Sequence, residues 1–385
     1  MPMATQHETE SQANGRPREP RFFTRVENFM ERVTDGMELE QLWTSLKQDA
    51  KSGFQLYSRE IDFKPAAKRR PRDWFALCRS FFWAVVMKLT PAKRIVLIIG
   101  MVLLFFPWGD VNNTGPSYHI FGGILILGLL VLEVADRVTM KRDLQIAREI
   151  QSWLVPAQPP AIPGFDSAFF TKPANTVAGD YYDIFYRDVP EIKNNVVIAI
   201  ADVAGKSIPA ALLMATFQAS LKTLSATRST IVGLTQSMNR YACKHSVAGA
   251  RFTTAFLGEF DPDTRDLTYV NAGHNAPILR RASGAIERLT VGGVPLGILD
   301  GGYESATLKL YAGDALLIFT DGVVEAENDR AEEYGEQRLL NIINMSAGMS
   351  ASEILQRVMA DVQMFTGSTP QHDDITCMVI KIRER

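Results

Sequence analysis

Aspartates stand repeatedly where an apolar run of the chain stops or starts. They are Asp180, Asp202, Asp321, Asp373 and Asp374. Asp202 closes the run 196–201, Asp321 closes 316–320, and the last two open 375–382. Strand ends meet loops on a rigid scaffold, so they can hold side chains in a fixed geometry at a cleft. The pattern predicts a site built from carboxylates.

Such a site would need a cation. Clustered carboxylates repel one another and titrate upward unless a cation lies among them. Oxygen ligands without His or Cys favour Mg²⁺ or Mn²⁺ over zinc, and a pair of such ions suits hydrolysis of a phosphoester. Each aspartate alone has a simpler reading as a turn or a solvated strand start, since Asp-Gly is a common turn pair. No Gly-rich phosphate loop is present, which argues against a kinase or an ATPase.

The elements that must position these residues lie in segment 164–385. Apolar or β-branched runs predict strands at 195–201, 252–260, 267–270, 276–280, 315–320 and 375–382. Helical spacing predicts helices at 208–225, 231–245, 336–345 and 352–366. The turn 261–264 (DPDT) between two strands predicts a hairpin. The fold class expected is α+β, an antiparallel sheet or β-sandwich flanked by helices.

Composition excludes several classes of protein. The chain has 385 residues, a net charge of −2 and a pI near 6.3, so nothing indicates nucleic-acid binding. Cys78, Cys243 and Cys377 show no C-x-x-C pairing, which argues against a disulfide scaffold and a thiolate zinc site.

Two apolar stretches, 95–108 and 120–132, are separated by a short polar turn without Lys or Arg. With their flanks they predict a transmembrane hairpin at 91–136, with spans of about 92–108 and 118–135. Basic residues flank both ends: Lys64, Lys68, Arg69, Arg70, Arg72, Arg79, Lys88, Lys93 and Arg94 before, and Arg137, Lys141 and Arg142 after. The positive-inside rule then places both flanks in the cytoplasm. A buried helical hairpin of a soluble domain and a re-entrant loop are the alternatives.

The remaining regions have simpler expectations. Residues 1–20 read as a disordered tail, and 21–90 as a cytosolic helical and basic juxtamembrane region in which 74–89 forms an interfacial helix. Segment 137–163 is predicted to be a connecting helix (140–155) with a Pro-rich linker, running directly out of the second span. That helix is a candidate coupling rod and a candidate seam for a homodimer.

Taken together, the motifs of the C-terminal segment resemble the PPM (type 2C) protein phosphatases, in particular the bacterial SpoIIE/RsbU-like branch. The segments that carry the resemblance are GDYYD (179–183), ADVAGK (201–206), FTTAF (252–256), NAGHN (271–275), GVPLG (293–297), TDGVVEA (320–326) and DDIT (373–376). Their order matches across roughly residues 147–381, a little over half of the chain.

The resemblance implies a β-sandwich with outer helices and two Mn²⁺ or Mg²⁺ ions at one end. It implies that Asp180 and Asp202 lie near the shared water, with the backbone carbonyl of Val203 completing one shell. Asp321 and Asp373 would bind the second side, with Asp374 a further candidate. The implied activity is phosphoserine or phosphothreonine hydrolysis, on a phosphorylated STAS-type anti-anti-sigma protein. Relatives of this branch use a helix pair as a regulatory switch, and the hypothesis here is that helix 140–155 biases it.

One departure concerns the leaving-group acid. Eukaryotic relatives place a histidine two residues after the second aspartate, and Ala204 stands there. His274 could serve in kind, although a structural role in the strand turn is the favoured interpretation. Two other functions remain open. One is a catalytically silent membrane-tethered scaffold, and the other is a receptor, for which the external turn is too small to fold around a ligand.

Overall fold

The computed structural model describes residues 79, 82–83, 86–106, 118–189, 194–245 and 251–384. The predicted tail 1–20, nearly all of 21–90 with most of its interfacial helix, and most of the polar turn lie outside this part of the chain. The chain divides into two compact units, Met1–Val134 and Ala135–Arg385.

In the first unit, helix α4 (Pro91–Phe105) packs antiparallel to the start of helix α5 (Tyr118–Leu154). Lys93 Nζ lies 3.0 Å from Glu133 Oε2, and His119 Nδ1 lies 2.8 Å from the carbonyl oxygen of Leu104. Between these two contacts, Gly100 and Gly122 are both buried. A Cβ on Gly122 would lie 2.7 Å from the carbonyl oxygen of Gly100, so the two backbones touch where side chains are missing.

The first half of α5 turns its apolar side chains outward. Large apolar residues along it are exposed, among them Ile120, Ile124, Leu127 and Leu130. In the described part of the chain, α5 is the one helix long and apolar enough to cross a membrane, judged by length and composition. Helix α4 has 15 residues, fewer than the roughly 20 of a usual span. The two-span hairpin therefore stays a prediction.

Helix α5 is one continuous element of 37 residues, about 55 Å long at the rise of an α-helix. The sequence predicted a span to residue 135 and a separate helix from 140 that continues it. The structure joins the two, since no proline or glycine interrupts residues 129–154. The helix ends just before Pro156, which cannot continue the backbone hydrogen bonding.

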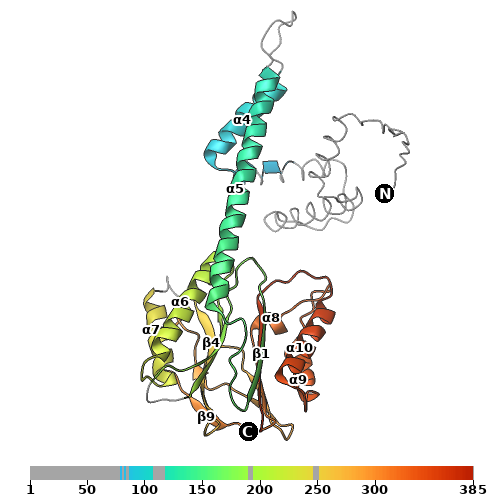
Figure 1. The fold of residues 1–385 in the computed structure, drawn as a ribbon. Coiled ribbons are helices and arrows are strands. Elements are labelled where there is room, and N and C mark those ends of the chain that lie inside the picture. The colour runs from blue at the N-terminus through green and yellow to red at the C-terminus, as the bar shows by residue number, and fades with distance from the viewer. Residues whose placement is uncertain are drawn as a thin grey trace, which may run out of the picture. The chain divides into compact units, whose positions relative to one another are not determined.

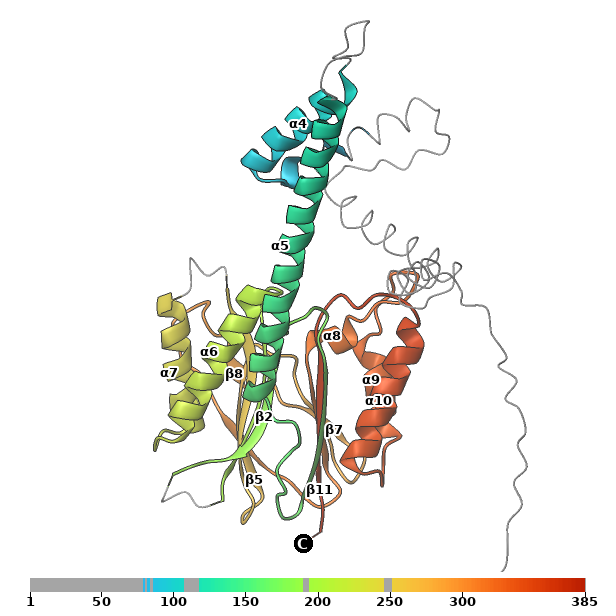
Figure 2. The ribbon, with the colours of Figure 1, turned by 45° about the horizontal axis from the view of Figure 1, so that its top comes forward.

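The second unit is a sandwich of two sheets (Figures 1 and 2). One sheet has the order β1 (Phe165–Lys172), β11 (Ile375–Ile382), β10 (Ala315–Phe319), β6 (Ile278–Arg280), β7 (Ile286–Arg288). The other has the order β2 (Tyr181–Tyr186), β3 (Val196–Val203), β4 (Thr253–Asp261), β5 (Asp266–Ala272), β8 (Gly292–Gly293), with β9 (Ala306–Lys309) also on β5. All pairs are antiparallel except β5 with β8.

Helices cover the outer face of each sheet. Helices α6 (Ile208–Ser225) and α7 (Ile231–His245) lie on the β2–β8 sheet, and the short α8 (Asp321–Val324), α9 (Glu336–Asn344) and α10 (Ala351–Thr366) lie on the other (Figure 2). Helix α10 begins at a capping box, in which Ser350 Oγ accepts from the Glu353 N–H and the Glu353 carboxylate accepts from the Ser350 N–H. The predicted α+β sandwich flanked by helices is confirmed.

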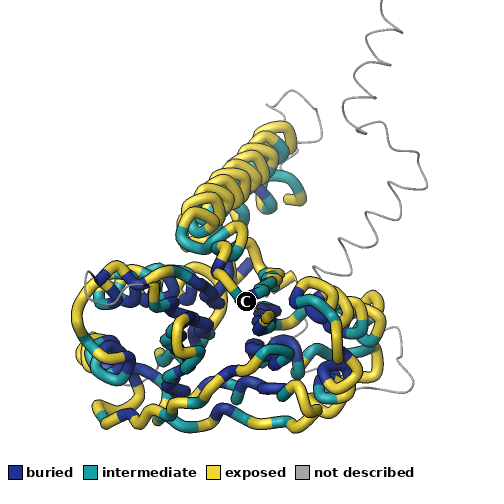
Figure 3. The backbone as a smooth tube through the Cα atoms, turned by 60° about the horizontal axis from the view of Figure 1, so that its bottom comes forward, coloured by how far each residue is buried: buried dark blue, intermediate teal, exposed yellow. Residues whose placement is uncertain are grey.

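Three apolar cores hold these layers together, one between the sheets and one under each helical layer. In Figure 3 the buried residues are dark blue and the exposed residues yellow. On β3, Ile198 and Ile200 enter the core between the sheets, whereas Val197 and Ala199 face α6 and α7. Both faces of the central strands are buried, which is why these strands read as unbroken apolar runs.

Element boundaries follow the sequence closely where such patterns exist. Helices α6 and α7 and strand β11 begin and end at the predicted residues, and the hairpin turn joins β4 to β5. Strands β1, β2, β7, β8 and β9 were not predicted. Strand β1 (FDSAFFTK) mixes polar and apolar residues and is mostly half-buried, so it carries no clear period.

Candidate metal centre

The strand register brings the predicted aspartates to one end of the sandwich. Asp180 directly precedes β2, and Asp202 lies one residue from the end of the antiparallel neighbour β3, where Tyr181 pairs with Ala201. Asp321 follows β10, and Asp373 precedes β11. These two strands are antiparallel neighbours, and Phe319 at the end of β10 pairs with Cys377 near the start of β11. Two adjacent strand ends come from each sheet, so Asp180 converges with Asp373 and Asp374, which lie 193 and 194 positions later in the chain.

Asp180 and Asp202 form the buried half of this cluster. Burial, followed by the charge of Asp202, raises the pKa of Asp180 well above its usual range. Burial, followed by the charges of Asp321, Asp373 and Asp374, raises the pKa of Asp202 to about 7. Asp180 and Asp202 thus each sense the charge of neighbouring carboxylates.

Asp321 and Asp373 form the more open half. Burial, followed by the charge of Asp373, raises the pKa of Asp321. Lys206 Nζ lies 2.9 Å from Asp373 Oδ2 and also donates to the carbonyl oxygen of His372. The lysine comes from the ADVAGK segment, so it ties the end of β3 to the start of β11.

Asp374 has a different environment from its neighbour. Its Oδ1 accepts a hydrogen bond from the Ala174 N–H at 2.7 Å, and its Oδ2 accepts one from the Gly179 N–H at 2.6 Å. Both donors belong to loop 173–180, which joins the two sheets. The contacts make Asp374 an anchor for the loop that carries Asp180, while its ligation of a metal stays a prediction.

The donor set fits hard divalent cations. Five carboxylates share one end of the fold. Burial first, and then the charges of neighbouring carboxylates, raise the pKa values of four of them: Asp180, Asp202, Asp321 and Asp374. Added positive charge would relieve that repulsion. Within the described residues, no three acidic, His or Cys side chains are already drawn together as a ligand cage. The carbonyl oxygen of Val203 lies beside the cluster's loop, 3.2 Å from where a Cβ of Gly179 would be.

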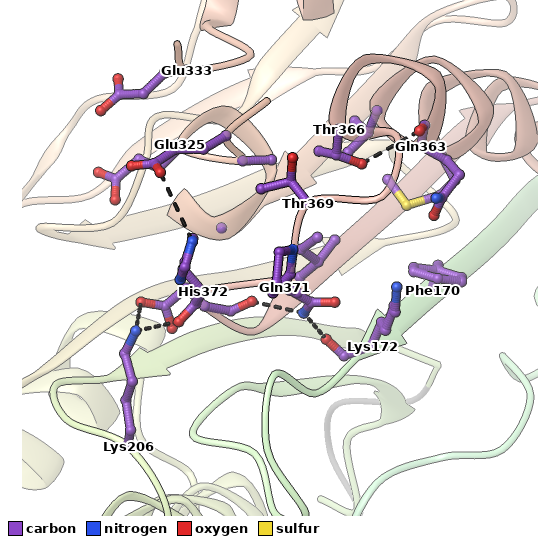
Figure 4. A pocket seen from close by; sticks show the side chains of 18 residues that line it. Phe170, Lys172, Lys206, Glu325, Glu333, Gln363, Thr366, Thr369, Gln371 and His372 are labelled. Atoms are coloured by element: carbon purple, nitrogen blue, oxygen red, sulfur yellow. Dashed lines mark hydrogen bonds and ion pairs between the residues drawn. The ribbon is translucent and has the colours of Figure 1, made fainter. Parts of the chain in front are cut away.

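A cavity of about 250 Å³ opens beside Asp373 (Figure 4). Lys206, His372 and Gln371 lie on one side of it, with Glu325 and Glu333 across from them. Apolar side chains of α10 and neighbouring strands, including Met359, Val362 and Ile375, complete the lining. The cavity gives the cluster a mixed polar and apolar approach.

His274 is enclosed in protein. Its Nδ1 lies 3.0 Å from Thr254 Oγ1, and its backbone N–H donates to Asn271 Oδ1 at 2.7 Å. Burial lowers the pKa of His274 to about 4, so the ring is neutral near pH 7. These contacts give it the structural role favoured from sequence, linking the NAGHN turn to β4.

Two functional contacts were not predicted from the sequence. Thr320 Oγ1 donates to Asp180 Oδ2 at 3.0 Å, and the side chain of Gln151 in α5 bonds to Ala178, two residues before Asp180. Thr320 could have been suspected, because it stands beside Asp321 at the same strand end. No signal in the sequence pairs Gln151 with Ala178.

Comparison with known proteins agrees with this geometry. The model of the family "Stage II sporulation protein E (SpoIIE)" matches residues 193–383. The chain is 30% identical over 246 residues to phosphoserine phosphatase RsbU of Bacillus subtilis, covering 63% of this chain and 70% of RsbU. It is 27% identical over 299 residues to protein IcfG of Synechocystis sp., covering 70% of this chain but only 46% of IcfG.

Solved structures share the fold. The SiaA-PP2C domain of Pseudomonas aeruginosa aligns with a TM-score of 0.57 at 21% identity, covering 64% of this chain and 99% of that domain. The PP2C phosphatase domain of SpoIIE from Bacillus subtilis, with a fragment of its regulatory domain, aligns with a TM-score of 0.50 at 18% identity, covering 57% of this chain and 64% of that one.

The fold and these relatives define a PP2C-type domain, the class of metal-dependent protein serine/threonine phosphatases. Within that class, the chain belongs to the SpoIIE family, in the branch that includes RsbU.

Proposed function

We propose that this chain is a membrane-anchored protein serine/threonine phosphatase that acts on a phosphorylated signalling protein. The observation that carries the proposal is the convergence of Asp180, Asp202, Asp321 and Asp373 at one end of the sandwich, where their charges act on one another. A phosphatase that activates water with cations needs such a concentration of oxygen ligands.

The residues divide into two groups for metal binding. Asp180, Asp202 and the carbonyl oxygen of Val203 would hold one Mn²⁺ or Mg²⁺, and Asp321 and Asp373 the other. Two such ions supply an activated water and neutralise charge on the phosphoryl group. Within the chain, Thr320 orients the Asp180 carboxylate, and Asp374 fixes the loop that carries it.

The proposed membrane anchor is the helical pair 91–136, with both flanks in the cytoplasm. Its support is the outward-facing apolar surface of α4 and α5 and the basic residues on either side. We divide the chain accordingly into a tail (1–20), a basic juxtamembrane region (21–90), the hairpin, a connecting helix and linker (137–163) and the phosphatase domain (164–385).

The proposed substrate is a phosphorylated STAS-type anti-anti-sigma protein in a partner-switching pathway. RsbU, the relative described as a phosphoserine phosphatase, supports phosphoserine as the bond that is cleaved. A homodimer through α5 is part of the proposal, because Ile146, Ile150 and Trp153 form an exposed apolar stripe at helical spacing.

The activity is tested on the full chain in detergent. We expect Mn²⁺-dependent release of phosphate from a phosphoserine-bearing STAS protein, loss of at least 100-fold in Asp321→Asn, and no change in Asp329→Asn, an exposed aspartate eight residues away. Equal rates in wild type and Asp321→Asn would show that the assigned site is wrong. Binding of the phosphoprotein without turnover would favour the scaffold.

The topology is tested with reporter fusions. Alkaline phosphatase fused after Asn112 should be active, whereas green fluorescent protein fused at the C-terminus should fluoresce, because each reporter works on only one side of the inner membrane. An inactive alkaline phosphatase at Asn112 would exclude the two-span arrangement and leave the re-entrant or soluble alternatives.

A further inference from the structure

The side chain of Gln151, in the last turn of α5, is paired with the backbone N–H and C=O of one residue of the phosphatase domain, Ala178. Gln151 Nε2 donates to the carbonyl oxygen of Ala178 at 2.7 Å, and the Ala178 N–H donates to Gln151 Oε1 at 2.9 Å. The side-chain amide thus bonds to Ala178 as the backbone N–H and C=O of a neighbouring strand would. The orientation of the Gln151 amide is determined, since the Ala178 N–H needs an acceptor and the Ala178 carbonyl needs a donor.

The paired residue lies in the loop that positions the metal ligands. Loop 173–180 has no strand or helix of its own, yet Ala178, Gly179 and Asp180 are buried. Gln151 holds Ala178 and Asp374 holds Gly179, so both residues before Asp180 are fixed by side chains from distant elements. Gly179 in turn packs against Val203, whose carbonyl oxygen is, with Asp202, a further predicted ligand of that ion.

Few hydrogen bonds join the end of α5 to the rest of the described chain. Among the described residues 140–154, Gln151 is the side chain that hydrogen-bonds outside its own helix. A cavity of about 300 Å³ lies next to it, lined by Arg148, Gln151 and Ser152 of α5 together with Asp180 and Met214. Within the described residues, the hydrogen bonds between the helix end and the loop are therefore those of Gln151 with Ala178.

We infer that Gln151 is a positioning residue for the metal centre: its amide holds Ala178 so that Asp180 and the Val203 carbonyl can bind one cation together. The inference rests on the proposed function. It also names the contact through which the position of α5 would affect metal affinity. The sequence suggested that this helix has a regulatory role but named no contact. Removing a hydrogen-bond partner that orients metal ligands typically lowers metal affinity by about 10- to 100-fold.

The test compares Gln151→Met, which keeps the length of the side chain and removes both bonds, with Gln145→Met, an exposed glutamine of the same helix. In the full chain, free Mn²⁺ is measured by electron paramagnetic resonance, and hydrogen exchange is followed across residues 174–181 without metal. Gln151→Met should weaken Mn²⁺ binding by at least 10-fold and speed exchange in this segment. It should keep kcat at saturating Mn²⁺ within about threefold of wild type, and Gln145→Met should change none of these.

Gln151→Asn serves if Gln151→Met folds poorly, because it retains the amide but withdraws it by one C–C bond, about 1.5 Å. Its Mn²⁺ affinity should then fall below that of wild type. Unchanged Mn²⁺ affinity in a folded Gln151 variant, or an equal loss in Gln145→Met, would overturn the inference. If wild type binds Mn²⁺ but releases no phosphate, the proposed function fails while the affinity comparison still decides the role of Gln151. A wild-type chain that binds no Mn²⁺ overturns both.

Discussion

The hydroxyl of Thr320 joins the two sheets at the carboxylate cluster: its Oγ1 lies 3.0 Å from Oδ2 of Asp180, a residue 140 positions earlier. The same oxygen accepts a hydrogen bond from the N–H of Thr376 at 3.0 Å. Because a hydroxyl carries one proton, the bond from Thr376 leaves that proton for Asp180. Thr320 therefore orients the carboxylate and satisfies a buried backbone donor with one atom.

Thr320→Val should weaken the metal site and the fold together. The variant keeps the shape of the side chain but leaves the Thr376 N–H without an acceptor, at a cost of about 1–3 kcal/mol in the free energy of unfolding. Loss of the bond to Asp180 should lower Mn²⁺ affinity by about 10-fold or more. Titration calorimetry and chemical denaturation of the full chain measure the two effects.

Thr320→Ser is the matched control, since it retains the hydroxyl and removes only a methyl group. It should keep Mn²⁺ affinity close to wild type. A valine variant that binds Mn²⁺ as tightly as the serine variant would show that the hydroxyl does not orient Asp180.

Asp202→Asn should stabilise the metal-free chain at neutral and higher pH. The folded pKa of Asp202 is about 7, above the ordinary 3.8. The folded state therefore holds this proton more tightly, and the carboxylate's contribution to stability falls as pH rises from about 4 to about 7. Above pH 7 the folded chain carries the full cost of burying the Asp202 charge and of its repulsion by neighbouring carboxylates, so the variant should exceed wild type by a few kcal/mol in the free energy of unfolding.

Comparing the variant with wild type at each pH separates the contribution of Asp202 to stability from that of His274. The pKa of His274 is lowered to about 4, so its contribution to stability rises with pH between about 4 and 6.5 in both proteins and cancels in the difference. Saturating Mn²⁺ should reverse the order of stability, because only wild type gains binding energy. Stability is measured by denaturation in a chelator at pH 8. If Asp202→Asn is no more stable than wild type there, the assigned cost of the Asp202 charge is contradicted.

Helices and strands could be predicted from the sequence wherever burial produces a recognisable pattern of apolar residues. Strands β3 and β11 stand out because both of their faces are buried, and α6 because its apolar residues recur at helical spacing. Strand β2 (YYDIFY) was noticed only for its acids. The ends of such runs also located the aspartates, because a side chain at a strand end is set by the strand itself.

Contacts between distant segments could not be predicted in the same way. Gln151 and Thr320 each meet the Asp180 loop through a specific tertiary approach, and neither residue type nor spacing encodes its partner. Asp373 and Asp374 are equivalent in sequence and differ only in where the two carboxylates point. Their separate roles emerge from the hydrogen bonds of Asp374 to loop 173–180.

Alanine variants of the adjacent aspartates Asp373 and Asp374 should differ in stability. Asp374→Ala leaves the N–H groups of Ala174 and Gly179 without their carboxylate acceptor, which should cost about 2–5 kcal/mol in the free energy of unfolding. Asp373→Ala removes an exposed ion pair with Lys206, which contributes about 0–1 kcal/mol, and one hydrogen bond that the Asp374 N–H donates to Asp373 Oδ1 at 2.9 Å. Both variants should lose activity, but only Asp374→Ala should unfold earlier in a chelator. Equal midpoints for the two variants would remove the distinction.

The helical pair of the first unit depends on its two buried glycines. A Cβ on Gly122 would lie 2.7 Å from the Gly100 carbonyl oxygen and 2.7 Å from the Leu104 nitrogen, and backbone atoms in a helix cannot move aside. Gly122→Leu should therefore separate α4 from α5 and reduce the folded chain recovered from membranes several-fold, since small residues permit close helix packing in a bilayer. Gly123, the next residue, has open space around its Cβ position, so Gly123→Leu should behave as wild type. Gel filtration of fluorescent fusions in detergent measures both, and equal recovery of the two leucine variants would show that α4 and α5 do not pack through Gly122.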